Sequence, residues 1–109
     1  MAYTSIDNPE LYFQTKLFTG NGGTQSITLD GSENMQPDWC WFKNRTDAGN
    51  NHLLYDSVRG ATKRIQSSTN SAEATDSGGL TSFDSDGFSV GDKGSLNNSS
   101  SNIVAWNWK

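Results

Sequence analysis

Hydrophobic and polar residues alternate along several short stretches of the chain, which is the pattern of half-buried β-strands. Between Thr24 and Leu29, for example, Ile27 and Leu29 fall on one face and three small polar residues fall on the other. Runs rich in Gly, Asn, Asp and Ser separate these stretches, and such runs favour turns. We therefore predict short strands over Phe13 to Thr19, Thr24 to Leu29, Asp38 to Lys43, His52 to Asp56, Lys63 to Ser67, Leu80 to Phe83, Gly87 to Gly91 and Ile103 to Trp108.

The connecting segments predict part of the topology. A glycine-rich loop at residues 20–23 follows the first strand, so the first two strands are expected to form a hairpin. The Asp86-Gly87 pair predicts the tip of a second hairpin, between the strands that begin at Leu80 and Gly87. Segments 67–79 and 92–102 are predicted to be polar surface loops.

The strand over Asp38 to Lys43 is apolar on both faces. Trp39 and Trp41 share one face, and Cys40 and Phe42 share the other. A strand with two apolar faces is normally covered on both sides. In a chain of this size, we expect the second cover to come from another subunit.

Composition narrows the fold class. Ser, Thr, Asn and Gly make up 47 of the 109 residues, a composition that weakens helices and leaves few aliphatic side chains for a core. The chain is long enough for one compact domain. We expect an all-β protein, an antiparallel β-sandwich in which the tryptophans supply buried area or a subunit interface. The alternative is that they form an exposed platform for sugars: Trp39, Trp41, Trp106 and Trp108.

Charge and targeting features exclude several classes of partner. The net charge of −4 disfavours binding to the phosphates of nucleic acid, and the basic cluster Arg59, Lys63 and Arg64 is interpreted as a solvated turn. No apolar run is long enough to cross a membrane. The N-terminus lacks the pattern of a signal peptide, and one cysteine, Cys40, makes no internal disulfide, so we expect synthesis in a reducing cytoplasm.

Candidate chemistry is sparse. His52, the one histidine, could serve a serine relay only with Asp56 or Asp38, and His52 and Asp56 are predicted too far apart along one strand. The segment from Asp84 to Gly87 begins like a calcium loop but lacks the later ligands, so a turn is favoured. We therefore expect no enzyme activity, no metal and no cofactor.

Four blocks, in this order, resemble a β-domain family of tailed-bacteriophage virion proteins: QPDWCWFKNR at 36–45, LYDSVRG at 54–60, LTSFDSDGF at 80–88 and VAWNWK at 104–109. The family resemblance implies a jelly-roll or concanavalin-like β-sandwich. It also implies a tail-fibre or other structural protein, often of marine phages.

The resemblance implies a domain organisation and a role. Residues 1–17 are expected to form a short extended attachment arm, and residues 18–109 the β-sandwich. We expect a virion structural protein, most simply a tail fibre or fibre-attachment component, that forms a homo-oligomer, a trimer, and docks on other tail or capsid proteins. The alternatives are a lectin-like module for host surface glycans and a capsid decoration protein. The candidate interface or glycan residues are Trp39, Trp41, Phe42, Tyr55, Trp106 and Trp108, and the candidate arm contacts are Tyr3, Ile6, Leu11, Tyr12 and Phe13.

Overall fold

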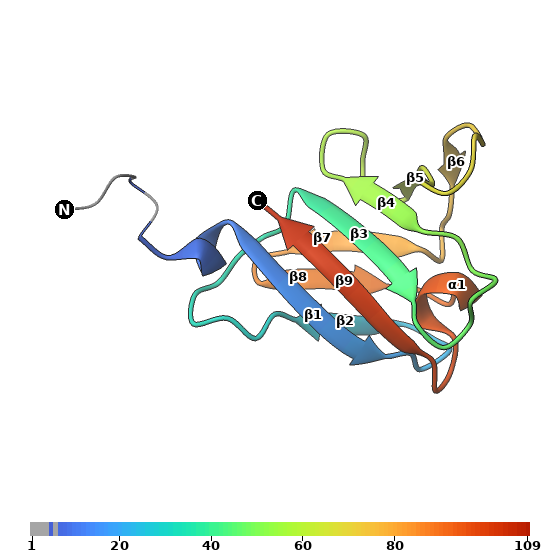
Figure 1. The fold of residues 1–109 in the computed structure, drawn as a ribbon, viewed down its shortest axis with the longest axis horizontal. Helices are drawn as coiled ribbons and strands as arrows, with labels where there is room; N and C mark the ends of the chain where they lie inside the picture. Colours follow the sequence, from blue (N-terminus) through green and yellow to red (C-terminus); the bar gives the residue numbers. More distant parts are fainter. Residues whose placement is uncertain (1–4, 6) are drawn as a thin grey trace.

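Two antiparallel sheets packed face to face form the body of the protein. The structure is a computed structural model that describes residue 5 and residues 7–109. The larger sheet has the order β1-β9-β3-β4, and Figure 1 shows it in front of the smaller sheet, whose order is β2-β8-β7. The strands are β1 (Phe13–Thr19), β2 (Gln25–Thr28), β3 (Trp39–Asn44), β4 (Leu53–Asp56), β7 (Leu80–Asp84), β8 (Gly87–Val90) and β9 (Asn102–Trp108). The predicted antiparallel β-sandwich is confirmed.

Short elements complete the fold outside the two sheets. A small ribbon of β5 (Lys63–Arg64) and β6 (Ala74–Thr75) lies beside β4, and Ile65 exchanges two backbone hydrogen bonds with Leu54. One turn of α-helix, α1 (Gly94–Asn97), and a 3-10 turn, η1 (Pro9–Leu11), are the helices of the described residues. Thus the predicted loops at 67–79 and 92–102 contain β6 and α1. In the same residues, no helix is long and apolar enough to span a membrane.

The core lies between the two sheets and is built mainly from aliphatic and phenyl side chains. The inward positions of β3 and β9 alternate with outward tryptophans, so Cys40, Phe42 and Ile103 are buried while their chain neighbours face away from the core. Phe42 meets Phe88 of the opposite sheet edge to face, with ring centroids 5.0 Å apart. The buried cluster is Ile27, Leu29, Met35, Cys40, Phe42, Leu53, Tyr55, Leu80, Phe88, Val90, Leu96, Ile103 and Ala105. The tryptophans are absent from this cluster, so the expectation that they supply the buried core is wrong, while the expectation that they form a subunit interface stays a prediction.

The β7–β8 hairpin is confirmed. Asp84 lies opposite Gly87, and Gly87 has a φ of 141°, a conformation that favours glycine. The Asp84 carboxylate accepts hydrogen bonds from two serine hydroxyls, and the Asp86 carboxylate accepts one from the Met35 N–H. These aspartates therefore serve the turn and its packing, as the sequence interpretation favoured.

The predicted hairpin of the first two strands is wrong. β1 pairs with β9 in the larger sheet, and β2 pairs with β8 in the smaller one. The glycine-rich loop carries the chain from one sheet to the other because its backbone is held by the α1 region. Gly22 donates its N–H to the carbonyl of Asn97, and the buried Asn97 side chain donates to the carbonyls of Gly23 and Gly91. The alternation of apolar and polar residues predicts where strands lie but not which strands are neighbours.

The sandwich begins earlier than the predicted boundary between 1–17 and 18–109. β1 starts at Phe13, which pairs with Trp108, and its pairing with β9 continues without a shift to Thr19. Residues 13–17 are therefore part of the larger sheet. The predicted boundary at residue 17 followed the start of the family resemblance. The alternation of apolar and polar residues already begins at Phe13.

Candidate binding surface

The outer face of the larger sheet carries a cluster of aromatic side chains, which we call the aromatic face. It comprises five residues from three neighbouring strands: Phe13 of β1, Trp106 and Trp108 of β9, and Trp39 and Trp41 of β3. The antiparallel register aligns them in two rows. Phe13 pairs with Trp108, which pairs with Trp39 on its other side, and Trp106 pairs with Trp41.

Local sequence explains this placement. Successive side chains of a strand point to opposite faces, so the alternation that sends Cys40 and Phe42 into the core sends Trp39 and Trp41 outward. The same applies to β9, where Asn107 is buried between the outward Trp106 and Trp108. The two apolar faces predicted for the Asp38 to Lys43 strand are confirmed, and the described chain supplies a covering sheet on one of them only.

The rings of the aromatic face pack against one another. Trp39 and Trp108 stack with centroids 4.7 Å apart and planes inclined by 26°, and Phe13 lies on the other side of Trp108 at 5.0 Å. Trp41 meets Trp39 at 6.4 Å in a stacked arrangement and Trp106 edge to face at 5.8 Å. Such pairs stabilise by about 0.5–1.5 kcal/mol beyond the area they bury. The cluster is therefore a packed layer on the sheet.

The aromatic face still presents apolar area to solvent. Trp39 and Phe13 are each 38% exposed, and the adjoining Leu17 of β1 is 57% exposed. Trp41, Trp106 and Trp108 are half-buried. Contiguous exposed apolar area of this kind is typical of a surface that contacts another molecule. Leu17 is a further surface residue that the sequence analysis did not select, although its alternation with Thr15 and Phe13 was a usable signal.

Polar groups border the aromatic face along β4. The Trp41 indole N–H donates to Nδ1 of His52 at 2.9 Å, so that nitrogen acts as the acceptor. Arg59 donates to Asp56 through its backbone N–H and its Nε, and also pairs with Glu73. Burial opposes ionisation of Asp56, but the hydrogen bonds and charge of Arg59 outweigh it and hold the pKa of that carboxyl below its usual value. His52 thus orients a tryptophan rather than a nucleophile.

Two of the predicted surface residues belong to the core. Phe42 is 1% exposed and Tyr55 is fully buried, and their rings meet edge to face. Burial, with the nearby charge of Asp76, raises the pKa of the Tyr55 hydroxyl. Both residues face inward because they occupy the inward phase of β3 and β4. They therefore belong to the packing of the two sheets and not to a surface that meets solvent.

The predicted arm contacts divide into three groups. Tyr3 and Ile6 lie outside the described residues. Leu11 and Tyr12 are exposed at the end of η1, and Phe13 is part of the aromatic face. The described structure brings only Phe13 together with the tryptophans.

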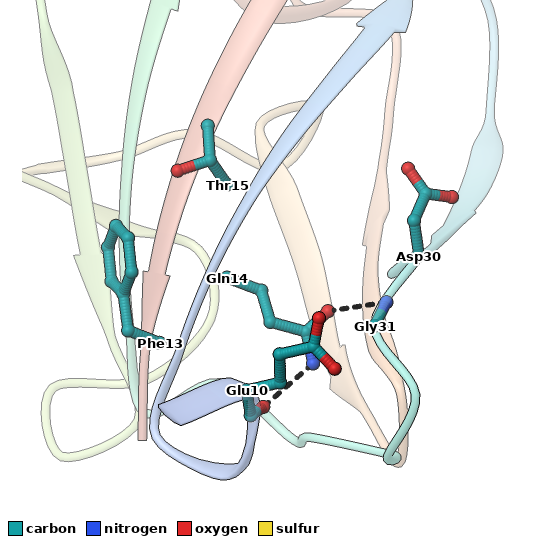
Figure 2. A pocket seen from close by; sticks show the side chains of 6 residues that line it. All are labelled: Glu10, Phe13, Gln14, Thr15, Asp30 and Gly31. Atoms are coloured by element: carbon teal, nitrogen blue, oxygen red, sulfur yellow. Dashed lines mark hydrogen bonds between the residues drawn. The ribbon is translucent and has the colours of Figure 1, made fainter. Parts of the chain in front are cut away.

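A hollow of about 250 Å³ lies between β1 and the loop that follows β2. Figure 2 shows Gln14 reaching across it, where Gln14 accepts a hydrogen bond from the Gly31 N–H and donates to the Glu10 carbonyl. The Glu10 carboxylate accepts from the backbone and hydroxyl of Ser32, which lowers the pKa of Glu10. Asp30 binds Lys16 at 2.6 Å. These hydrogen bonds connect η1 to the loop. Because the polar groups around the hollow are bonded to one another, they are not arranged to bind and orient a substrate.

The remaining candidates for chemistry are bonded within the fold. Cys40 donates to Asn107, and its burial, with the nearby charge of Asp38, raises the pKa of the thiol, which disfavours the thiolate. Within the described part of the chain, no three His, Cys, Asp or Glu residues lie where they could hold one metal ion.

The two arginines of the basic cluster form ion pairs within the fold. Arg59 pairs with acidic residues as described above, and Arg64 pairs with Asp76. Lys63 donates to the hydroxyl of Thr75 on the neighbouring strand. These side chains brace the β5–β6 ribbon against the sandwich. The interpretation of the cluster as a solvated turn is wrong for the two arginines, because the side chains of Arg59 and Arg64 are only 24% and 16% exposed.

Comparison with known proteins assigns a family to almost the whole chain. Residues 8–109 match the family described as Domain of unknown function (DUF7483). No curated protein and no solved structure matches the chain. The matched span includes Phe13 and all of β1, in agreement with the larger sheet as the structure shows it.

Proposed function

The chain belongs to the DUF7483 family, and for this member we propose a non-enzymatic structural role in the virion of a tailed phage. The protein is an oligomeric tail-fibre or fibre-attachment component that docks on other tail or capsid proteins through the aromatic face. The observation that carries this proposal is the solvent-facing layer of four tryptophans and Phe13, on a sheet whose opposite side already holds a complete core.

The ring geometry favours a protein partner over a sugar. A pyranose ring stacks on a bare aromatic ring face, whereas Trp108 has Phe13 on one side and Trp39 on the other. Trp41 has its own neighbours in Trp39, Trp106 and His52. A packed layer that leaves Phe13, Trp39 and the aliphatic Leu17 partly exposed fits the interior of a protein interface, where aromatic residues are enriched.

The phage assignment is supported by the four sequence blocks that resemble virion β-domains. Two of these blocks, at 36–45 and 104–109, contain all four tryptophans of the aromatic face. Four of the five residues of the aromatic face therefore lie within the blocks that carry the resemblance. The expected three copies per assembly stay a prediction.

Recovery of the chain with purified particles tests this proposal. In banded particles of the phage that encodes the chain, quantitative mass spectrometry is expected to find it at a fixed copy number. The double variant Trp39→Thr/Trp108→Thr has threonine, a strand-forming residue, at both positions. It is expected to fold but to be absent from the purified particles. Val58→Thr is the matched control, because Val58 is 94% exposed and is not part of the aromatic face. Absence of the native chain from particles, or full incorporation of the double variant, would overturn the proposal.

Titration with host polysaccharide tests the alternative, a glycan-binding function. Tryptophan emission of the isolated protein is expected to stay unchanged on addition of purified host polysaccharide. A saturable emission change that disappears in Trp39→Thr would replace the proposed protein interface with a glycan-binding surface.

A further inference from the structure

The outer edge of β1 carries unpaired backbone groups. Just beyond the two ends of β1, the Tyr12 carbonyl accepts from the Lys109 N–H, and the Gly20 N–H donates to the Ser101 carbonyl. The even-numbered positions therefore direct their backbone groups toward β9. In an antiparallel ladder, the alternate residues Phe13, Thr15 and Leu17 direct theirs away from it. Among the described residues, no strand pairs with this side of β1.

β1 is the longest and most regular free edge of the two sheets. It has seven residues, no proline and no shift in its pairing. β2 has only four residues, and β7 has an irregular register between Leu80 and Ser82. β4, at the other edge of the larger sheet, is partly covered because Leu54 bonds with Ile65. Short strands, bulges and covers protect edges from pairing. Among the described residues, β1 has no bulge, and of its outward backbone groups the Thr19 carbonyl accepts a hydrogen bond from the Gln25 side chain.

The one charge on β1 is compensated within the chain. A lysine that points inward from an edge strand can discourage pairing. The Lys16 ammonium, however, lies 2.6 Å from the Asp30 carboxylate, and its side chain is only 17% exposed. The edge therefore offers backbone groups and the exposed side chains of Phe13 and Leu17 without an uncompensated charge.

We propose that β1 pairs antiparallel with β1 of a second copy of this chain, with Thr15 opposite Thr15 of that copy. This register places Phe13 opposite Leu17 of the second copy, and the reverse pair forms by symmetry. Each of the three pairs exchanges two backbone hydrogen bonds, which gives about six in total. Thr–Thr and aromatic–aliphatic pairs are favourable across strands. The contact joins the two four-stranded sheets into one sheet of eight strands.

Side-chain pairing supports the same register. It places Lys16 of the second copy opposite Gln14, and each Lys16 keeps the Asp30 of its own chain as its partner. A register centred on Leu17 would instead place Phe13 opposite the polar Asn21, outside the strand.

The pairing makes the aromatic face continuous across both copies. A two-fold axis perpendicular to the sheet keeps both outer faces on the same side, so Phe13 and Leu17 connect the two sets of tryptophans. The contact uses each β1 edge once and closes at two copies, so it competes with the expectation of three copies per assembly. It is independent of the virion role, because solution mass tests it without any particle.

Engineered cysteines read the register directly. In the proposed pairing the two Thr15 Cα atoms lie about 5.5 Å apart, within the range of a disulfide. Thr15→Cys is therefore expected to give a covalent dimer under mild oxidation. Thr19→Cys is the matched control, because its two copies would lie about 27 Å apart. The native Cys40 is fully buried and does not compete. Equal cross-linking of Thr15→Cys and Thr19→Cys, preferential cross-linking of Leu17→Cys, or no cross-link would overturn the proposal.

Solution mass supplies an independent measurement. Light scattering of the full chain is expected to give twice the 11.9 kDa chain mass at high concentration. Thr15→Pro removes the central N–H donor at an edge position where proline is tolerated, and should lower the mass to that of one chain. Thr15→Val keeps the donor and should retain the dimer. Circular dichroism of all three proteins confirms that they are folded. A native chain that stays monomeric at about 1 mM overturns the proposal.

Discussion

The indole rings of Trp39 and Trp108 stack 4.7 Å apart on the outer face of the larger sheet, and connect the first residue of β3 to the last residue of β9. Because β3 and β9 are antiparallel neighbours, these two ends meet at the same edge of the molecule. Trp108 is packed on both sides, whereas Trp39 is more exposed. The stack therefore contributes to stability and also forms the surface proposed to meet a partner.

We predict that Trp39→Ala is less destabilising than Phe42→Ala, although both residues lie on β3. Trp39 is 38% exposed and loses mainly its stacking, so about 1–2 kcal/mol of the free energy of unfolding should be lost. Phe42 is buried, and its removal leaves a cavity that costs about 3–5 kcal/mol. Urea denaturation followed by circular dichroism measures both values. An equal cost would mean that the outer layer is as much a core as the inner one.

Gly87 is predicted to tolerate no side chain. Its φ is 141°, and a Cβ placed there would lie 1.9 Å from the Ile27 carbonyl oxygen of β2. Gly87→Ala should therefore destabilise by about 3 kcal/mol through strain and displacement of β2. Gly94→Ala is the matched control, because a Cβ there has no atom within 4 Å and the change should be within about 1 kcal/mol of neutral. Thermal denaturation measures both effects. An equal change in the melting temperature of the two variants would contradict this prediction.

The Cys40 thiol is predicted to be unreactive in the native protein. It is fully buried, donates to Asn107, and has a pKa raised by burial. Only the thiolate attacks a disulfide reagent, so labelling by an aromatic disulfide should await unfolding. The rate should rise through the same urea range as the loss of circular dichroism. Rapid stoichiometric labelling of the native chain would show that β3 opens locally.

The sequence predicted the strands well but their environment only in part. Period two correctly separated Trp41 from Phe42, yet it could not tell which face meets the second sheet, because both faces are apolar. That choice depends on the inward phase of β8, where Phe88 fills the space beside Phe42. The partner strands of β1 and β2 were also hidden. The loop that separates β1 from β2 is held by the buried Asn97 side chain, which looks like one more loop residue in the sequence.

Acid is predicted to weaken the protein through Asp56. Hydrogen bonds and charge from Arg59 outweigh the opposing effect of burial, so the pKa of Asp56 is lower in the folded chain than the usual value of 3.8. As pH falls, the unfolded chain takes up this proton first. The stabilisation is therefore fully present above about pH 5 and is lost as pH falls through the folded pKa. Asp56→Asn should reduce the free energy of unfolding at pH 7, and its difference from the native chain should shrink near pH 3. Glu10, whose pKa is also lowered, titrates in both proteins and cancels in that comparison. A difference that is constant from pH 7 to about pH 3 would show that the Asp56–Arg59 pair contributes no stability through its charge.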